Sequence, residues 1–448
     1  MIAVARSEMA KATMEGMIDQ LAAQGLRTLC GASPRTGRGN SLSSRINRSS
    51  PRILYLTSSW PHDRSFGGQL RALHIGRALQ KIAKVTVAVV SSDSASPEVI
   101  TRAVEEFAVE PPVRVNVQRN GGLIRRFQWA FDPRFLNVHG CVADAADRNR
   151  LLNRLTDFDL IWVMNSRTPN ILNQWHWPRA VLDIDDLPSV FHRTVWRNGA
   201  SLKEKLKAGI QMHLSRRRES FWKERFDVLS VCSEADRQYL GGGDHIHVIP
   251  NGFERPTKEP VCNSADPPRI GFIGLYSYSP NLEGMKWFLR ECWPLVKRAI
   301  PNARVRLVGK DTDGPLRPNA PDIDALGYVD DPADEIATWS TLIVPVIHGA
   351  GTRVKIAEGF SRKCPVVSTC LGSYGYDVRD GRELLLADDP RKFAAACVSL
   401  IRDRAGAKAM AERAYAAFLE KWTWDAIAPR VWAAAEDALR LSRQGRYA

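Results

Sequence analysis

The chain has 448 residues, a formal net charge of +14 and 44% apolar residues. This length exceeds one hydrophobic core and indicates two domains, and the ordinary apolar share excludes global disorder. No stretch approaches the roughly 18 uncharged apolar residues that a membrane-spanning helix needs. The N-terminus mixes acids and bases where a signal peptide requires an apolar run. The positive net charge has two interpretations. It attracts anionic partners, namely phosphates, nucleic acid or anionic membranes, or it has no functional meaning.

The eight cysteines are scattered and form no C-x-x-C pair. This spacing argues against a zinc site or a disulfide scaffold and favours a reducing compartment. We therefore expect a cytoplasmic protein without a structural metal.

Residues 1–50 differ from the rest of the chain. The part after Leu29 is rich in Gly, Ser and Arg and lacks acidic residues. Such a segment buries too little apolar surface to offset its ordering entropy, so we expect a disordered leader.

The first domain is expected over residues 51–255. Apolar runs predict strands near 53–60, 85–92, 158–166, 180–186, 226–233 and 245–252, with a helix after the first of them. Continuous apolar strands that alternate with helices are typical of a parallel sheet covered on both faces.

A Pro- and charge-rich linker over 256–267 precedes a second run of alternating strands and helices over 268–410. Helical sequence fills 411–448 and is expected to pack back toward the first domain. The fold class predicted from this order is α/β, with two Rossmann-like doubly wound domains that face each other across a cleft.

The segment from His348 to Glu358 carries the strongest chemical signal. Gly349 and Gly351 allow close approach of the backbone to a ligand. A helix beginning near Thr352 would direct free N–H groups and a positive dipole at that space. Arg353 and Lys355 add positive charge, and Glu358 would lie about 9 Å along the helix. This pattern indicates a diphosphate-binding site in which a carboxylate accepts hydrogen bonds from ribose hydroxyls. The alternative is an ordinary capped helix with exposed basic residues.

Residues 349–386, which begin GAGTRVKIAEGFSRK, resemble the donor-binding signature of the family-4 (group 1) glycosyltransferases. So do PNGF at 250–253, GFIGLYSYSPNLEGMKWF at 271–288 and GYVDDPADEIATWSTLIVPV at 327–346. The resemblance extends from about Ile53 to the C-terminus. It implies the GT-B fold and sugar transfer with retention from a nucleoside diphosphate sugar, without metal or other cofactor.

The resemblance also implies a set of donor-binding residues, with Glu358 on the ribose. They are Gly67, Gly68, Gly274, Tyr328, Val329, Gly349, Gly351, Thr352, Arg353, Val354, Lys355 and Glu358. Two positions depart from the family pattern: Ala350 replaces the first of two glutamates, and Leu275 replaces a basic residue. Both departures shift the expected phosphate contacts toward Arg353 and Lys355.

VLDIDDLP at 181–188 resembles a strand that ends in His-Asp in many relatives, with Asp185 on the histidine position. Asp185 is therefore the candidate for orienting or deprotonating the acceptor hydroxyl. Strand alternation would leave Asp186 on the opposite face. The spacing also mimics a D-x-D metal motif, which the resemblance to GT-B disfavours. His192 is a second base candidate, although a surface histidine is the more ordinary interpretation.

Two basic segments are candidates for acceptor or membrane contact. Residues 201–226 form a basic helical pattern with Leu202, Leu206, Ile210 and Leu214 as an apolar stripe. A core contact under a solvated face is favoured there over binding to anionic lipid. Residues 119–135 mix arginine with aromatics and are expected to form a loop on the acceptor side.

The function predicted from these observations is a glycosyltransferase acting on a glycan or lipid-linked acceptor, in surface polysaccharide synthesis. Its expected partners are the nucleotide-sugar donor, the acceptor and an anionic membrane surface at the inner face of the membrane, and no nucleic acid. Two alternatives stay open: another GT-B enzyme such as a nucleotide-sugar epimerase, and a non-catalytic binding subunit.

Overall fold

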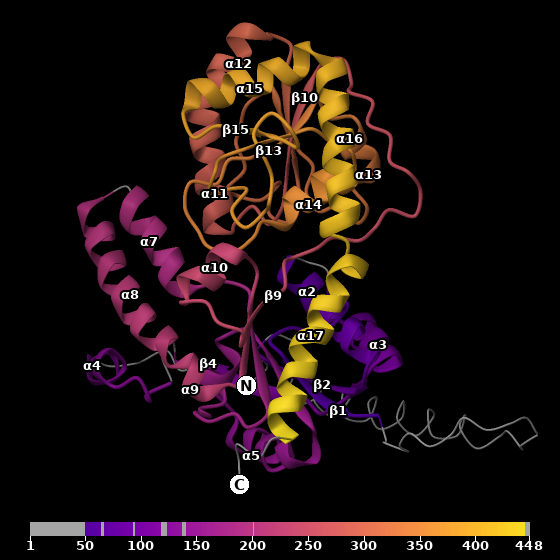
Figure 1. Cartoon of the computed structure of the whole chain (residues 1–448). Helices are drawn as coiled ribbons and strands as arrows, with labels where there is room; N and C mark the ends of the chain where they lie inside the picture. The colour runs from indigo at the N-terminus through magenta and orange to yellow at the C-terminus, as the bar shows by residue number, and fades with distance from the viewer. Residues whose placement is uncertain are drawn as a thin grey trace, which may run out of the picture.

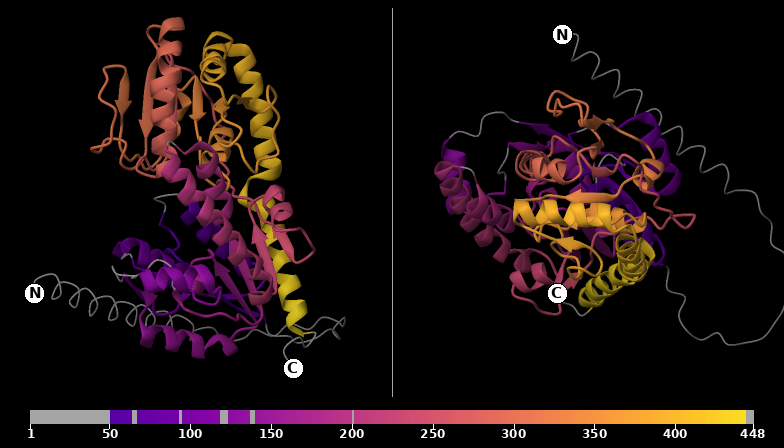
Figure 2. Two further views of the ribbon diagram at one scale, coloured as in Figure 1. Left: turned by 90° about the vertical axis from the view of Figure 1, so that its left-hand side faces the viewer. Right: turned by 90° about the horizontal axis from the view of Figure 1, so that it is seen from above.

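The computed structural model describes residues 50–63, 67–92, 95–117, 123–136, 140–199 and 201–443 (Figure 1). The leader expected at 1–50 lies outside the described residues, except for Ser50. The described chain forms two sheets, each covered by helices, and Figures 1 and 2 show the two α/β units stacked end to end.

The first unit contains a sheet of nine described strands in the order β5-β4-β2-β1-β6-β7-β8-β9, with β3 beside β2. Its neighbours are parallel except for the antiparallel pair β4 and β5. The strands are β1 (Arg52–Thr57), β2 (Lys84–Ser91), β3 (Ala108–Val109), β4 (Val113–Val117), β5 (Cys141–Ala143), β6 (Leu160–Met164), β7 (Ala180–Ile184), β8 (Val228–Val231) and β9 (Ile246–Val248).

Alternate side chains of these strands pack into two separate cores, because helices cover both faces of the sheet. Ile53 and Tyr55 of β1 point into one core, and Leu54 and Leu56 point into the other. The helices of this unit are α2 (Gly67–Gln80), α3 (Pro97–Glu106), α4 (Leu123–Phe131), α5 (Ala145–Asn153), α6 (Thr168–Ile171), α7 (Pro188–Asn198), α8 (Leu202–Ser220), α9 (Trp222–Arg225) and α10 (Glu234–Tyr239), with a 3₁₀ turn at Leu155–Asp157.

The second unit has an all-parallel sheet in the order β12-β11-β10-β13-β14-β15. Its strands are β10 (Arg269–Ile273), β11 (Arg304–Val308), β12 (Ile323–Ala325), β13 (Thr341–Val344), β14 (Val366–Ser368) and β15 (Leu385–Leu386). Its helices are α11 (Ser279–Trp287), α12 (Trp293–Ala299), α13 (Ala333–Ala337), α14 (Val354–Ser361), α15 (Pro390–Arg402) and α16 (Arg404–Lys421), with a π-helical segment at Phe288–Cys292. That segment lies between α11 and α12, just before Pro294, which has no N–H to donate.

The last helix, α17 (Trp424–Arg443), returns to the first unit (Figure 1). Ile427, Val431 and Ala435 join the core that Ile53 and Tyr55 enter. The chain thus crosses between the units twice, and Phe253 N–H donates to the Trp422 carbonyl at 2.9 Å where the two crossings meet.

Two expectations about the first unit were wrong. Residues 123–131 form α4 instead of a loop, and the short strands β3, β4 and β5 were not foreseen. β4 contains no continuous apolar run because most of its residues face solvent. In the part of the chain that the structure describes, no helix is both long and apolar enough to cross a bilayer.

Candidate functional site

A cavity of about 2250 Å³ lies between the two units, near the carboxyl ends of their parallel strands, where open α/β sheets bind ligands. The residues expected at the site that line it are Gly68, Asp185, His192, Gly274, Tyr328, Val329, Thr352, Arg353, Val354, Lys355 and Glu358. Gly67 begins α2 beside Gly68. Gly349 and Gly351 are not on the cavity wall.

The glycine turn lies at the contact between the units, and its first amide, that of Gly349, contacts the first unit and not a ligand. Gly349 N–H donates to Thr194 Oγ at 2.8 Å, so this amide already has a partner. A side chain at Gly349 would collide with the Arg353 guanidinium, and one at Gly351 would collide with Asp186. Gly351 therefore permits close packing between the units, and Gly349 leaves room for the Arg353 guanidinium, while the residues after them form the cavity wall.

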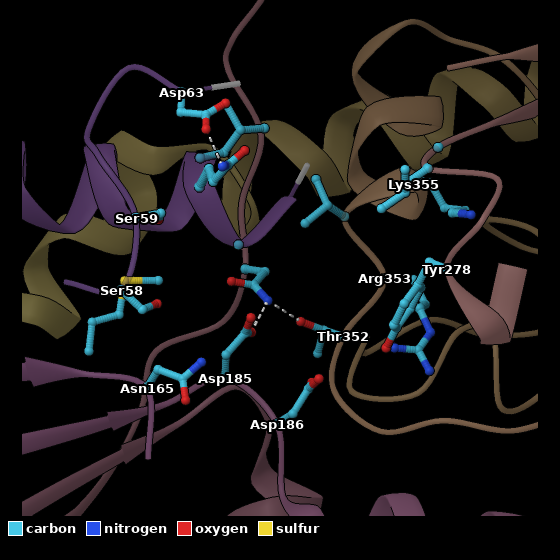
Figure 3. Close-up of a pocket in the computed structure, with 18 of the residues that line it drawn as sticks. Ser58, Ser59, Asp63, Asn165, Asp185, Asp186, Tyr278, Thr352, Arg353 and Lys355 are labelled. Atoms are coloured by element: carbon cyan, nitrogen blue, oxygen red, sulfur yellow. Dashed lines mark hydrogen bonds between the residues drawn. The ribbon is translucent and has the colours of Figure 1, made fainter. Parts of the chain in front are cut away.

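Helix α14 begins at Val354, two residues after Thr352 and thus close to the expected start, because Arg353 still has an extended backbone. This start places the Arg353 side chain at the cavity, beside Tyr278 in Figure 3. Arg353 is 8% exposed and donates from Nη1 to the Ala350 carbonyl. Its Nε and Nη2 are buried and have no hydrogen-bond partner. A buried guanidinium with open donors is suited to bind an anion.

Lys355 lies on the first turn of α14, above Arg353 in Figure 3. Its Nζ donates to Asn281 Oδ1 at 2.8 Å and lies 4.2 Å from the centre of the Phe272 ring. Burial, together with the charge of Arg353, lowers the pKa of Lys355 to about 7. A diphosphate in the cavity would favour the protonated amine.

Glu358 follows one turn later on the same helix and lines the same cavity as Tyr328 and Val329. Its carboxylate is 12% exposed and lies 3.8 Å from Arg362 Nε. Burial raises the pKa of Glu358 to about 6, although Arg362 and Lys355 act in the opposite direction. The side chain is therefore ionised at neutral pH and accepts hydrogen bonds.

Asp185 and Asp186 follow the end of β7 on the opposite wall (Figure 3). Asp185 Oδ1 accepts a hydrogen bond from Asn251 Nδ2 at 2.7 Å and a weaker one from Cys232 Sγ at 3.3 Å. Asp186 also lines the cavity, contrary to the expectation that it faces away, because strand alternation ends at Ile184. Asp183, in contrast, is fully buried and paired with Arg71.

The other end of the cavity lies in the first unit and is rich in aromatic side chains, namely Trp129, Trp175 and Trp222. Trp129 belongs to α4, so the described part of the basic and aromatic segment 119–135 does reach the cavity. His192, on α7, lines the wall and packs edge-on against Phe191.

Sequence reasoning missed several residues that hold these groups in place. They are Arg71, Asn251 and Asn281, together with Thr194 at the glycine turn. Asn251 lies in the PNGF segment that supports the resemblance, but nothing in its spacing showed that its side chain contacts Asp185. Arg71 gave no signal, because an arginine on an amphipathic helix normally faces solvent.

Among the described residues, no group of three His, Cys, Asp or Glu side chains is arranged to hold a metal ion. The seven described cysteines are all free thiols.

Comparison with known proteins adds three findings. Residues 267–403 match the family model of the group 1 glycosyl transferases. An uncharacterised protein from the cps region of Klebsiella pneumoniae is 26% identical over 161 residues, which cover 34% of this chain and 42% of that protein. The match thus spans less than half of the curated relative.

Two solved structures share the fold at low sequence identity. Sucrose-phosphate synthase from Thermosynechococcus elongatus superposes with a TM-score of 0.62 at 16% identity, over 88% of this chain and 98% of that chain. HepE of Anabaena, crystallised with UDP-glucose, gives a TM-score of 0.54 at 16% identity, over 85% of this chain and 98% of that chain. The chain therefore has the GT-B fold, and most of its second unit matches the group 1 glycosyl transferase model.

Proposed function

We propose that the protein is a glycosyltransferase that moves a sugar from a nucleoside diphosphate sugar onto a glycan or lipid-linked acceptor. The observation that carries this proposal is the Arg353 guanidinium, which is buried at the cavity with two open donor atoms. Lys355 follows it on the first turn of α14, and Asp185 lines the same cavity from the other unit. This pairing of a cationic seat with an opposing carboxylate suits the transfer of a group away from a diphosphate.

In the proposed reaction, the bond between the sugar C1 and the diphosphate breaks, the acceptor oxygen bonds to C1, and the proton of the acceptor hydroxyl passes to Asp185. Arg353 and Lys355 stabilise the negative charge that develops on the leaving diphosphate, so that protein cations perform this role without a metal. Glu358 accepts hydrogen bonds from the ribose, and Asp185 orients the acceptor hydroxyl. Retention of the anomeric configuration is proposed from the match to the group 1 glycosyltransferases.

Two of the comparisons support the substrate class. HepE has the same fold and was crystallised with UDP-glucose, which supports a UDP-sugar as donor. The Klebsiella relative belongs to a cps region, which supports a role in surface polysaccharide synthesis.

The variant Glu358→Ala tests the donor site. We expect the wild-type protein to bind at least one of UDP, GDP, ADP and dTDP in a calorimetric titration. We expect Glu358→Ala to weaken that binding about 100-fold or more, because hydrogen bonds to a charged acceptor are lost. Glu291→Ala, on the exposed surface, is the matched control and should leave the affinity unchanged.

Wild-type affinity in Glu358→Ala would remove this residue from the ribose site. A wild-type protein that binds none of the four nucleotides would contradict the proposed function. Binding without any transfer or hydrolysis would favour the non-catalytic alternative, for which the replacement of the family's first glutamate by Ala350 is the supporting observation.

We further propose that the protein works at the cytoplasmic face of an anionic membrane, which α8 contacts. Three of the four residues of the apolar stripe of α8 make no core contact, contrary to the favoured expectation: Leu202 is 85%, Leu206 66% and Ile210 53% exposed, whereas Leu214 is half-buried at the cavity. Lys203, Lys205 and Lys207 are interleaved with it. Figure 1 shows α8 beside α7 at one edge of the molecule. An exposed apolar stripe among lysines suits an anionic lipid surface.

Vesicle sedimentation tests this contact. We expect wild-type protein to pellet with vesicles of phosphatidylcholine and phosphatidylglycerol but not with phosphatidylcholine alone. The pair Leu202→Glu and Leu206→Glu should reduce binding about tenfold, because each substitution removes apolar burial and adds repulsion. Val261→Glu, at another exposed apolar position, is the control. Equal pelleting of both variants would contradict the membrane contact.

A further inference from the structure

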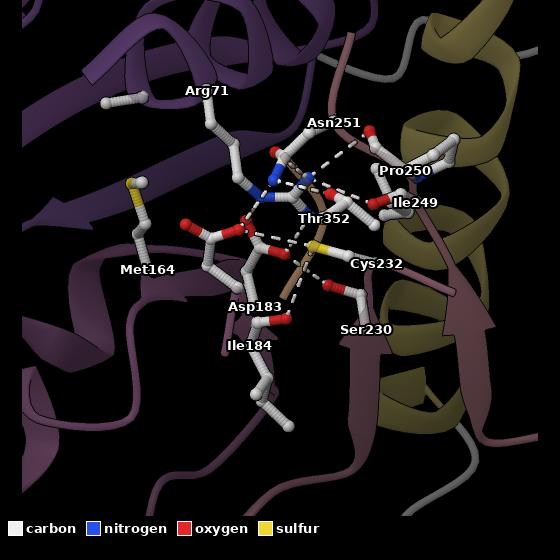
Figure 4. A network of polar contacts seen from close by, with 12 residues as sticks. Arg71, Met164, Asp183, Ile184, Ser230, Cys232, Ile249, Pro250, Asn251 and Thr352 are labelled. Carbon is white, nitrogen blue, oxygen red and sulfur yellow. Dashed lines mark hydrogen bonds and ion pairs between the residues drawn. The ribbon is translucent and has the colours of Figure 1, made fainter. Parts of the chain in front are cut away.

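Asn251 occupies the point where the chain crosses from the first unit to the second. It follows β9 by three residues and is 3% exposed. Figure 4 shows its side chain at the centre of a polar network that includes Arg71, Asp183 and Thr352. These partners come from helix α2, strand β7 and the segment that precedes α14.

Arg71 determines which way the Asn251 amide points. Arg71 is fully buried, and its Nε and Nη2 donate to the Asp183 carboxylate at 3.0 and 2.5 Å. Its Nη1 donates to Asn251 Oδ1 at 3.0 Å and to the carbonyls of Ile249 and Pro250 at 2.9 and 3.3 Å. A guanidinium donates only, so the amide oxygen must face it, and both amide protons must point away.

These two protons have two different acceptors. Asn251 Nδ2 donates to Asp185 Oδ1 at 2.7 Å and to Thr352 Oγ at 3.0 Å. Asp185 belongs to the first unit, whereas Thr352 directly precedes Arg353 in the second (Figure 3). The NH₂ group of Asn251 therefore links Asp185, which is proposed to bind the acceptor, to the segment that contains the proposed diphosphate-binding residue Arg353.

We propose that Asn251 is a positioning residue for the transfer reaction, which holds Asp185 and the Thr352 segment in one fixed geometry. This inference rests on the proposed function. The amide protons diverge from one nitrogen, so a displacement of Thr352 alters the bond to Asp185. The Arg71 contact prevents the amide from flipping to relieve such a displacement. Asn251 does not touch substrate in this scheme and acts through Asp185 and Thr352.

The variant Asn251→Asp tests this role with little change of shape. An aspartate keeps an oxygen acceptor for Arg71 but has no proton for Asp185 or Thr352. Asn302→Asp, on an exposed turn, adds the same charge elsewhere and is the control. Thr352→Val is a second variant, which removes only one acceptor and adds no charge.

Hydrogen exchange of the ligand-free protein provides the first measurement. We expect faster exchange in the peptide that covers 349–355 for Asn251→Asp and Thr352→Val, and no change for Asn302→Asp. Unchanged exchange at 349–355 in both variants would overturn the proposal. A uniform increase across the whole chain would overturn it as well, because that result indicates a purely structural role.

Release of UDP from UDP-glucose provides the second measurement. We expect Asn251→Asp to lower kcat between about tenfold and 100-fold, with a smaller change in KM, as for a lost hydrogen bond to a charged group. The double variant Asn251→Asp/Asp185→Asn should lose less than the two single losses combined, since part of the effect of Asn251 acts through the Asp185 carboxylate. Additive losses would overturn the role through Asp185. Absent UDP binding in wild-type protein would instead count against the proposed donor site, and hydrogen exchange would still decide the role of Asn251.

Discussion

Two buried arginines, one in each unit, show opposite uses of the same side chain. Arg71 in the first unit donates to the Asp183 carboxylate, to two backbone carbonyls and to Asn251 Oδ1. Arg353 in the second unit donates to the Ala350 carbonyl and leaves Nε and Nη2 without partners. A buried cation costs free energy unless its charge and donors are satisfied. The comparison teaches that Arg71 is satisfied by the fold, whereas Arg353 is left for a ligand to satisfy.

The largest expected effect is a loss of stability when Arg71 is replaced. Arg71→Met leaves the Asp183 carboxylate buried without its counter-ion, so we expect the free energy of unfolding to fall by about 3–5 kcal/mol. Urea denaturation measures this change. Arg77→Met, on the same helix and in a half-exposed ion pair, should cost about 1 kcal/mol or less. Equal free energies of unfolding for Arg71→Met and Arg77→Met would show that the Arg71 ion pair does not stabilise the fold.

Substituting Arg353 should instead affect binding. Arg353→Met removes the open donors, and we expect the affinity for the best-bound nucleoside diphosphate to fall between about tenfold and 100-fold. The free energy of unfolding should not fall, because an unsatisfied buried cation does not stabilise the fold. Calorimetric titration and urea denaturation measure the two quantities, with the exposed Arg382→Met as control. If Arg353→Met lowered the free energy of unfolding and left the nucleotide affinity unchanged, Arg353 would serve the fold and not the ligand.

The smallest expected effect is a pH dependence from Lys355. The pKa of this amine is lowered from 10.5 to about 7 by burial and by the charge of Arg353. A bound diphosphate favours the protonated form, so affinity should fall as the pH rises above about 7, by less than about tenfold per pH unit. Titrations between pH 7 and 8.5 should show this slope, and Lys355→Arg should flatten it because arginine stays charged. An unchanged slope in that variant would exclude Lys355 as its source.

The lowered pKa of Lys355 also affects stability, and its contribution to stability rises with pH, whereas the affinity for a diphosphate falls. Between about pH 7 and the ordinary lysine pKa of 10.5, the unfolded state binds a proton at Lys355 that the folded state does not. The free energy of unfolding of the ligand-free protein therefore receives a contribution from Lys355 that rises with pH over this interval.

Much of the fold could be predicted from local sequence. The apolar runs at β1, β2, β6, β7 and β8 predicted strands, since a strand buried on both faces requires an unbroken run of apolar residues. Strands β4 and β5 at one end of the sheet could not be predicted in this way, because three of the five residues of β4 are exposed and β5 has only three residues. The stripe on α8 was recognised, but its exposure was not, since periodicity locates an apolar face without showing what covers it.

Local sequence patterns were sufficient to predict the fold class and the residue types at the cavity, because buried strands, glycine turns and basic residues have local signatures. Which of the buried polar groups have hydrogen-bond partners became visible only in the folded chain. It showed Gly349 bonded to Thr194, Arg71 paired with Asp183, Asn251 holding Asp185, and Arg353 left open. These partners lie far apart along the chain, and whether a buried polar atom has a partner depends on packing between elements that no local pattern encodes.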